Sequence, residues 1–295
     1  MLVVYFFCVI LIFFMSFMVV NYIVWWGLFL VIDLFFVFLC KLEGCSYSRV
    51  INYFIFQEFL GLVFLIVRGW GVIQGVVVMC KIGLLPFHYW LLTVIDGLSG
   101  WVLFWFLTGQ KLPYIGILVV LASYVFIVLV FLGFVMVYLQ FFVIKDYFMI
   151  LVLSSTESFN WFFLGVLINL FSGLVLFLFY FLAGLLLLPF WRGVSKVNYG
   201  WLTTLIYINI PLGVSFLVKM FVLGLAVNYL FLFLLFVMVL MYISFISIFR
   251  WFMLISFEVV LEEVKVDGFI FMIFALIFLL LIYYFFFVLF VQLNR

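Results

Sequence analysis

The sequence predicts an all-α polytopic membrane protein, and three observations support this fold class. Of the 295 residues, 73% are hydrophobic and only 7% are charged, too few polar residues to cover a soluble domain. The apolar residues form runs of about 20, the length that a helix needs to cross a bilayer. Polar residues gather between the runs and leave no room for a soluble domain, so residues 1–295 are expected to form a single transmembrane domain.

Polar, charged and helix-breaking residues separate the predicted helices. These breaks lie at Asn21, Lys41–Arg49, Arg68–Gly71, Asp96–Gly100, Pro113, Gln140–Asp146, Gly165–Asn169, Pro189–Gly200, Asn228 and Arg250–Gly268. About eleven transmembrane helices result from the length criterion. Their predicted ranges are 2–20, 23–40, 50–67, 72–90, 98–118, 121–139, 144–164, 169–189, 201–225, 229–249 and 269–291.

The distribution of basic residues agrees with an odd number of helices. With eleven alternating spans, one side of the membrane collects Lys41, Arg49, Lys145, Arg192, Lys196, Arg250 and Lys265, and the other side collects Arg68 and Arg295. Loops on the matrix or cytoplasmic side normally carry the excess of Lys and Arg. The N terminus is therefore expected on that side and the C terminus on the opposite one.

Several function classes are disfavoured. A formal net charge of +2 is too small to indicate a nucleic-acid partner. The four cysteines form no CxxC pair, which argues against a metal site or a disulfide framework. No nucleotide-binding glycine loop or nucleophilic triad is present. The chain is therefore expected to hold no metal, cofactor-binding or catalytic residues of its own.

The predicted spans contain charged residues at Asp33, Glu58, Lys81, Lys111 and Lys219. The span 144–164 also carries Lys145, Asp146 and Glu157, and the sequence does not determine how deep these three lie. A charge near the bilayer centre costs at least about 2.5–3.5 kcal/mol, and such residues normally mark an ion or proton path. Two other interpretations stay open. A lysine can snorkel its ammonium to the headgroups, and a buried ion pair can be purely structural. Lys81 and Lys219 lie near the middle of their spans, which disfavours snorkelling.

A lysine is suited to proton transfer because burial favours its neutral form, whereas a nearby carboxylate favours its charged form. A lysine whose carboxylate partner moves can therefore bind and release a proton near neutral pH. Asp33 and Glu58 are the candidate partners. His88, the single histidine, can also carry protons at physiological pH. A hydrogen-bonded histidine at the membrane interface, beside Tyr89 and Trp90, is an equally good interpretation of that residue.

Three of the four prolines neighbour the buried lysines. Pro86 follows Lys81, Pro113 follows Lys111 and Pro211 precedes Lys219. Proline breaks a helix, and broken helices within a membrane commonly line cavities and build ion sites. A simple packing kink is the alternative, but the coincidence occurs three times.

Several motifs follow one another in an order that resembles one known family. The segment KIGLLPFHYW at 81–90 is similar to a lysine–proline–phenylalanine–histidine–tryptophan motif in subunit 2 of mitochondrial NADH:ubiquinone oxidoreductase, respiratory complex I. Further similar segments are WWGL (25–28), YFIFQ (53–57), QKLP (110–113), SSTESFNW (154–161) and IPLGVSFLVKM (210–220).

The resemblance implies an antiporter-like bundle with two broken helices, in the membrane arm of complex I and in the mitochondrial inner membrane. Lys81, Lys111 and Lys219 match the three intramembrane lysines of the family's proton pathway. The resemblance also implies that FMN, iron–sulfur clusters and ubiquinone sites belong to other subunits. Expected partners are other membrane-arm subunits, including neighbouring antiporter-like chains, and phospholipids such as cardiolipin.

The family's pathway glutamate does not carry over, because Phe29 occupies its position. Asp33 lies four residues further on, hence on the same helix face one turn away. We hypothesise that Asp33, or failing that Glu58, replaces the glutamate as the partner of Lys81. Gly109 also departs from the family pattern, which has tryptophan at that position.

Three functions remain open on the sequence. The first is a proton-translocating subunit of complex I. The second is a structural membrane-arm subunit with a vestigial proton path, an alternative that the loss of the family glutamate favours. The third is a stand-alone cation/proton antiporter, which would share the fold, although the short length argues against it.

Overall fold

The structure is a computed structural model, which describes most of the first 177 residues. The described residues are 2–95, 98, 100–143, 147–171, 173–175, 177, 219, 220, 222, 239 and 242. The chain divides into two compact units, 1–199 and 200–295. All the helices described below belong to the first unit, so the prediction of one domain over 1–295 stays a prediction.

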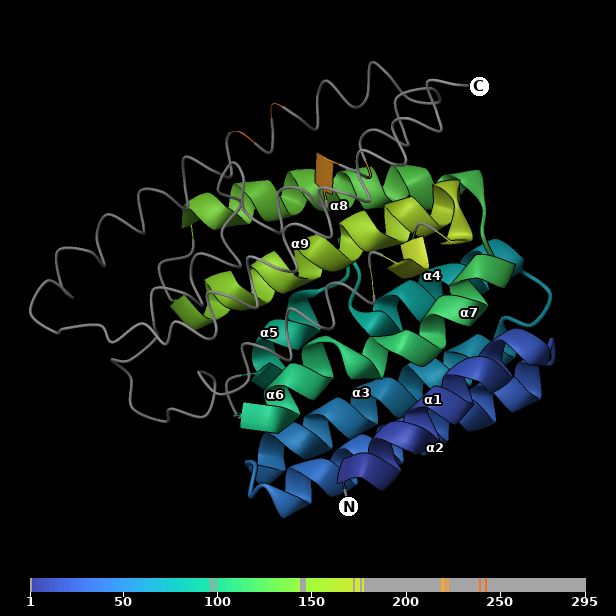
Figure 1. The fold of residues 1–295 in the computed structure, drawn as a ribbon, viewed down its shortest axis with the longest axis vertical. Coiled ribbons are helices and arrows are strands. Elements are labelled where there is room, and N and C mark those ends of the chain that lie inside the picture. The colour runs from blue at the N-terminus through green and yellow to red at the C-terminus, as the bar shows by residue number, and fades with distance from the viewer. Residues whose placement is uncertain are drawn as a thin grey trace, which may run out of the picture. The chain divides into compact units, whose positions relative to one another are not determined.

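The described part of the chain is helical and contains no strand, in agreement with the predicted all-α class (Figure 1). Its elements are α1 (Leu2–Met18), α2 (Tyr22–Leu42), α3 (Tyr47–Ile66), α4 (Gly71–Ile82), α5 (Tyr89–Ile95), α6 (Gly100–Leu107), the 3-10 helix η1 (Gly109–Lys111), α7 (Leu112–Val120), α8 (Tyr124–Val143) and α9 (Tyr147–Ile168).

Within the described residues, four helical stretches are long and apolar enough to cross a membrane. They are Tyr22–Leu42, Tyr47–Ile66, Val102–Val120 and Tyr124–Phe141. The predicted spans 2–20, 23–40, 50–67, 121–139 and 144–164 coincide, within a few residues at each end, with α1, α2, α3, α8 and α9. The predicted spans from 201 onward and most of 169–189 lie outside the described residues, so the total of about eleven stays a prediction.

The predicted span 72–90 is divided into two helices, in the region where Pro86 was expected to break the helix. Helix α4 ends at Ile82, and the chain turns before α5 begins at Tyr89. Gly83 has a φ of +72°, a left-handed conformation that glycine adopts without strain and that commonly ends a helix. Pro86 follows in the same turn, where its missing N–H interrupts no helix.

The predicted span 98–118 is broken as well. Helix α6 ends at Leu107, η1 follows, and α7 starts at Leu112. Pro113 lies in the first turn of α7, a position where proline removes no helical hydrogen bond. Pro113 therefore marks the start of a helix segment and not a kink within one. The second expected break, at Pro211, lies outside the described residues.

Packing brings the interrupted helices into the interior. Helix α7 packs against both α1 and α4, α3 packs against α2 and α4, and α8 packs against α9 (Figure 1). The close approach of α7 to α1 requires Gly116, because a Cβ atom there would lie 2.5 Å from Oγ of Ser16. Small residues allow such close contacts between membrane helices.

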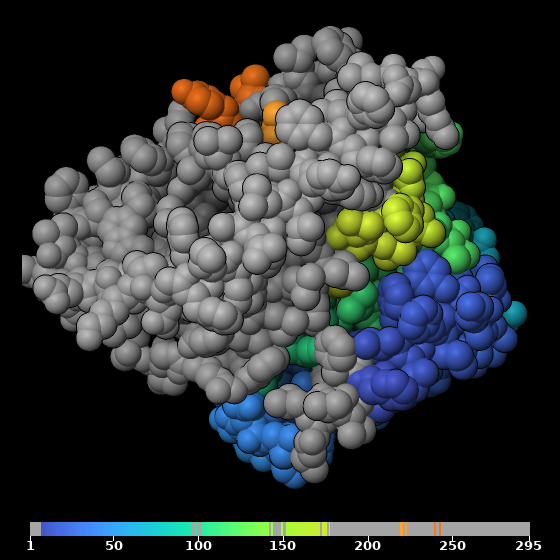
Figure 2. Space-filling view, viewed as in Figure 1, coloured from blue at the N-terminus to red at the C-terminus, as the bar shows by residue number. Residues whose placement is uncertain are grey.

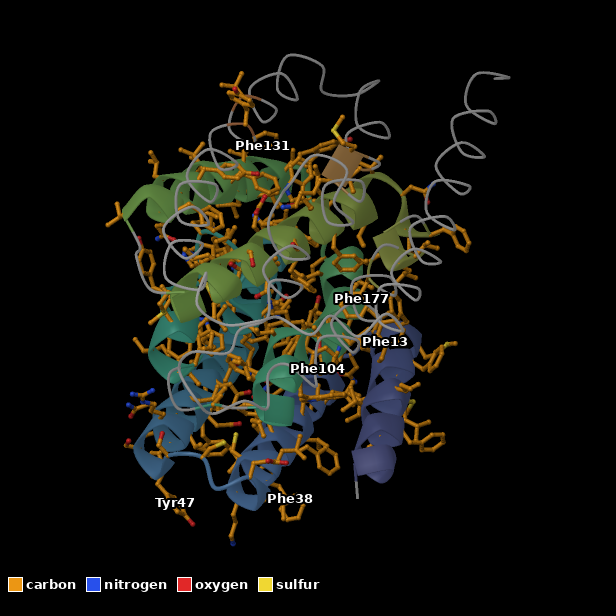
Figure 3. The ribbon with its side chains drawn as sticks, turned by 60° about the vertical axis from the view of Figure 1, so that its left-hand side comes forward. Phe13, Phe38, Tyr47, Phe104, Phe131 and Phe177 are labelled. Atoms are coloured by element: carbon orange, nitrogen blue, oxygen red, sulfur yellow. The ribbon has the colours of Figure 1, made fainter. Side chains whose placement is uncertain are left out.

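Aromatic side chains occupy both the interior and the outer surface. Phe104 of α6 is buried, whereas Phe38 of α2 and Tyr47 of α3 point away from the bundle (Figure 3). Helix α1 also presents exposed apolar side chains, among them Phe14 and Met18, and its dark-blue atoms lie open on the face shown in Figure 2. An apolar outer surface of this kind is expected for helices that contact lipid or other membrane proteins.

Candidate functional site

Lys81 lies in the last turn of α4, where the helix is interrupted, and its side chain is buried. The partial negative charge at a helix C terminus stabilises a cation there. The interruption therefore does more than bend the chain. It places the buried Lys81 in the last turn of a helix, where the helix dipole favours a positive charge.

The carbonyls at the end of α4 need hydrogen-bond partners, because most of the residues there are buried from water. Backbone N–H groups of Gly83 and Leu84 donate to the carbonyls of Cys80 and Met79, the pattern of a Schellman motif. Nε1 of Trp90 also donates to the carbonyl of Cys80, at 2.9 Å. Thus α5, although short, stabilises the end of α4.

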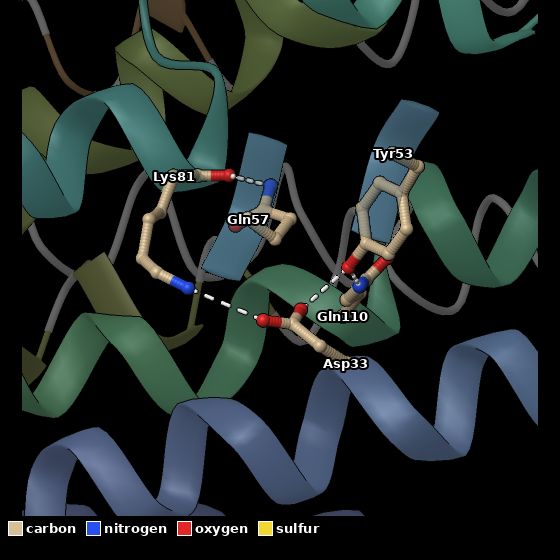
Figure 4. Close-up of polar contacts among 5 residues, drawn as sticks. All are labelled: Asp33, Tyr53, Gln57, Lys81 and Gln110. Carbon is tan, nitrogen blue, oxygen red and sulfur yellow. Dashed lines mark hydrogen bonds and ion pairs between the residues drawn. The ribbon is translucent and has the colours of Figure 1, made fainter. Parts of the chain in front are cut away.

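Asp33 of α2 forms an ion pair with Lys81, with Oδ2 of Asp33 3.2 Å from Nζ of Lys81 (Figure 4). Both side chains are buried. The hypothesis that Asp33 lies on the face of α2 directed at Lys81 therefore agrees with the geometry. Removing one member of such a pair leaves an uncompensated buried charge, which costs about 3–5 kcal/mol.

Phe29 occupies the position of the family glutamate and also contacts Lys81. Nζ of Lys81 lies 5.0 Å from the centre of the Phe29 ring and 6.0 Å from that of Tyr114. The two rings stack on each other at 4.9 Å. An aromatic face attracts a cation, most strongly where water is excluded. The ammonium of Lys81 thus contacts the carboxylate of Asp33. It also lies near the ring of Phe29, one turn earlier in α2, at the position of the family glutamate.

Two further polar residues extend the pair into a hydrogen-bonded chain (Figure 4). The hydroxyl of Tyr53 donates to Oδ1 of Asp33 at 2.6 Å. Nε2 of Gln110, in η1, donates to the same hydroxyl. The chain Lys81–Asp33–Tyr53–Gln110 therefore joins α4, α2, α3 and η1, and it ends one residue before Lys111.

Gln57 connects α3 to the end of α4. Its Nε2 donates to the carbonyl oxygen of Lys81 at 2.9 Å, and its side chain is buried. Sequence reasoning missed Tyr53, Gln57 and Gln110 as site residues. A signal was present, since Tyr53 and Gln57 are four residues apart and therefore lie on one face of α3.

Lys111 is buried at the break between α6 and α7. Its Nζ lies 4.8 Å from the centre of the Phe159 ring of α9. Within the described part of the chain, Nζ of Lys111 makes no hydrogen bond or ion pair. The charged form of Lys111 thus has fewer stabilising partners than that of Lys81.

Lys81 and Lys111 line the same small cavity, although they belong to different helices. Gln57, Gln110, Trp90 and Tyr114 also line it. The cavity has room for about one water molecule. The structure therefore brings two of the three predicted intramembrane lysines to one polar space.

Glu58 and His88 lie apart from this arrangement. Glu58 is partly exposed on α3 and, among the residues described, forms no ion pair with Lys81. His88 is buried, with Nε2 2.6 Å from Oε1 of Gln140 and Nδ1 3.3 Å from the carbonyl oxygen of Pro86. Of the two candidate partners of Lys81, the geometry favours Asp33. A proton-transfer role for Glu58 or His88 stays a prediction.

Lys219 belongs to the second unit, where it is helical and buried. Sequence reasoning also gave no role to Glu157, which is fully buried in α9. The hydroxyl of Tyr138 donates to Oε1 of Glu157 at 2.8 Å, and Nε1 of Trp161 lies 3.3 Å from the same oxygen. A buried carboxylate in a predominantly apolar span was the available signal.

Comparisons with known proteins give a consistent result. The chain is 42% identical to NADH-ubiquinone oxidoreductase chain 2 of Caenorhabditis elegans over 202 residues, which cover 68% of this chain and 71% of the relative. It is 39% identical to NADH-ubiquinone oxidoreductase chain 2 of Ascaris suum over 222 residues, covering 74% of this chain and 73% of the relative. No family model matches the chain.

Proposed function

Because the chain belongs to the NADH-ubiquinone oxidoreductase chain 2 family and is a membrane-arm subunit of respiratory complex I, we propose that it translocates protons through its buried lysines. Complex I as a whole is the oxidoreductase, and its other subunits are the partners of this chain. In this proposal, electron transfer drives proton movement past Lys81, Lys111 and Lys219.

One observation supports the proposal most strongly: Lys81, which forms an ion pair with Asp33, lines the same cavity as Lys111. A proton leaving Lys81 breaks the pair and leaves Asp33 negatively charged. The hydroxyl of Tyr53, which donates to Asp33, then stabilises the remaining carboxylate. Lys111, with few partners for its charged form, accepts and releases the proton. Opening and closing of the pair would therefore control transfer between the two lysines.

The remaining site residues have supporting roles in the proposal. Lys219, His88 and Glu58 are proposed as further proton carriers. The broken helices around Pro86, Pro113 and Pro211 supply the helix ends at which the lysines lie. The chain is proposed to cross the mitochondrial inner membrane several times, beside neighbouring antiporter-like subunits and phospholipids such as cardiolipin. FMN, the iron–sulfur clusters and ubiquinone would bind to other subunits.

The decisive experiment replaces Lys81 and, separately, Lys111 by arginine in assembled complex I. Arginine keeps the positive charge and can pair with Asp33, but it does not release its proton in proteins. We expect either variant to lower proton translocation, coupled to NADH oxidation in sealed membrane vesicles, by about tenfold or more. Native gels stained for NADH dehydrogenase activity serve as the assembly control.

The same variants separate proton transfer from a structural role. If both arginine variants assemble and translocate the normal number of protons per electron, the lysines are only structural cations. The chain would then be a membrane-arm subunit with a vestigial path, and the proposal would be overturned.

A further inference from the structure

We propose that Gln57 and Gln110 are positioning residues for this proton transfer, and that their two amide oxygens together accept hydrogen bonds from one water molecule in the cavity between Lys81 and Lys111. The inference rests on the proposed function and adds to it the groups that orient the proton carrier. Neither glutamine was a candidate on the sequence.

The orientation of each amide is determined by its partner. Nε2 of Gln57 faces the carbonyl oxygen of Lys81, which can only accept, so the NH₂ group must be on that side. The hydroxyl of Tyr53 already donates its hydrogen to Asp33, so it can only accept from Nε2 of Gln110. Both amide oxygens are therefore left to accept hydrogen bonds from something else.

No described group of the protein donates to Oε1 of Gln57 or Oε1 of Gln110, although both atoms are buried. A buried acceptor without a donor costs about 1–3 kcal/mol. Both glutamines line the cavity that Lys81 and Lys111 share, and that cavity has room for about one water molecule. Two orphan acceptors that line one cavity of this size indicate a common donor.

The charges around the cavity favour water over a metal cation as this donor. Lys81 and Lys111 line the cavity, and one of them is an ammonium in the proposed transfer, so a metal cation would be repelled. A water molecule has two hydrogens for the two amide oxygens and two lone pairs that can accept hydrogen bonds from a lysine. The pair of glutamines would thus hold the water between the lysines without adding charge.

The transfer step balances through this water. One N–H bond of an ammonium breaks as an O–H bond forms on the water. One of the original O–H bonds then breaks as an N–H bond forms on the other lysine, which starts as a neutral amine. The water is regenerated, and one hydrogen bond to a glutamine breaks during the step. The glutamines therefore set the direction in which the water can donate.

Gln74 offers a matched control for the mutational test. Like Gln57, it is buried, donates from Nε2 to a backbone carbonyl, in this case that of Phe64 at 3.3 Å, and has an amide oxygen without a described donor. It differs in that it does not line the cavity. In assembled complex I, we expect Gln57→Met and Gln110→Met to lower coupled proton translocation about tenfold, and Gln74→Met to leave it within about twofold.

A conservative variant separates water positioning from packing. Gln57→Glu, in its protonated form, keeps both a donor and an acceptor, so we expect it to restore most of the activity that Gln57→Met loses. The inference is overturned if Gln57→Met and Gln110→Met translocate protons normally, if Gln74→Met loses as much as they do, or if Gln57→Glu does not restore activity. If the lysine-to-arginine variants lose proton translocation but the glutamine variants keep it, this inference is rejected and the proposed function stands.

A high-resolution density map of the complex tests the water directly. We expect one water peak within about 3.2 Å of both amide oxygens. A lysine ammonium that donates to both oxygens, or a metal ion at that position, would overturn the inference. This result does not depend on whether protons are pumped.

Discussion

The two buried lysines of the first unit lie at similar helix breaks but in different surroundings. Lys81 has a carboxylate partner, a helix C terminus and two aromatic rings. Lys111 has the ring of Phe159 and, within the described residues, no carboxylate partner. Two buried lysines at similar helix breaks thus have different partners for their charged forms.

Because of this difference, substitutions at the two lysines should affect the stability of the fold to different extents. At the Lys81 site, the charge is compensated by groups from several helices, so we expect a change there to alter both folding and the proposed proton transfer. At the Lys111 site, few contacts depend on the charge, so we expect a change there to alter the proposed proton transfer with little effect on folding. Four substitutions test this comparison, with effects on stability that decrease in order.

The largest loss of stability is expected for Asp33→Ala. The ammonium of Lys81 would remain buried without its partner, and the complex should lose about 3–5 kcal/mol of unfolding free energy. Graded heating of purified complex I, followed by native gels, measures the release of this chain. The double variant Asp33→Asn/Lys81→Met removes both charges and should recover most of the loss. A single variant as stable as the parent would contradict the comparison.

Tyr53→Phe should have the next largest effect. It keeps the ring but removes the hydroxyl that donates to Asp33, and a hydrogen bond to a charged group contributes about 1.5–3 kcal/mol. The same heating assay measures it. Tyr22→Phe is the control, because Tyr22 contributes ring contacts to Trp25 and Phe64. Equal losses in the two variants would show that the hydroxyl of Tyr53 adds nothing.

Gly83→Ala should cost about 1–2 kcal/mol, because a residue with a Cβ atom is strained at a φ of +72°. The new Cβ atom would also collide with Leu91. Gly27→Ala is the matched control, since no atom lies within 4 Å of the Cβ position there. If Gly83→Ala melts at the parent temperature, the end of α4 does not depend on the left-handed turn.

Lys111→Met should have the smallest effect on stability, about zero, because it removes a buried charge and no ion pair with a described residue. Proton translocation by the same complex should nevertheless fall about tenfold. Both quantities are measured on one preparation, by heating and by proton uptake into vesicles. A melting shift as large as that of Asp33→Ala would show that the two sites do not differ as described.

Sequence reasoning succeeded where the physical cause is local. Apolar runs predicted α2 and α3 to within three residues, because the bilayer thickness determines helix length. The four-residue spacing put Asp33 on the same helix face as Phe29, and the ion pair of Asp33 with Lys81 agrees with that arrangement. The break after Ile82 was missed in the helix ranges, since Gly83 lies in an apolar run and glycine within such a run does not by itself end a helix.

The pairing of distant residues was not accessible from local patterns. The contact between Asp33 and Lys81 joins residues 48 positions apart, and that between His88 and Gln140 joins residues 52 apart. The sequence did not reveal that Tyr53 and Gln110 would meet Asp33, because their helices lie far apart along the chain. The sequence favoured Asp33 as the partner of Lys81, with Glu58 as the second candidate, and the geometry also favours Asp33.

From its sequence alone this chain is a membrane protein whose interior holds a few costly charges, since hydrophobicity and helix length are properties of short segments. The packing of α2, α3, α4 and η1 around one another determines which charges meet and which glutamines line the cavity. It also determines how the surroundings of Lys81 differ from those of Lys111. A buried charge is stable only where several segments bring its partners within a few ångströms, and that condition is satisfied by the folded bundle and by no segment separately.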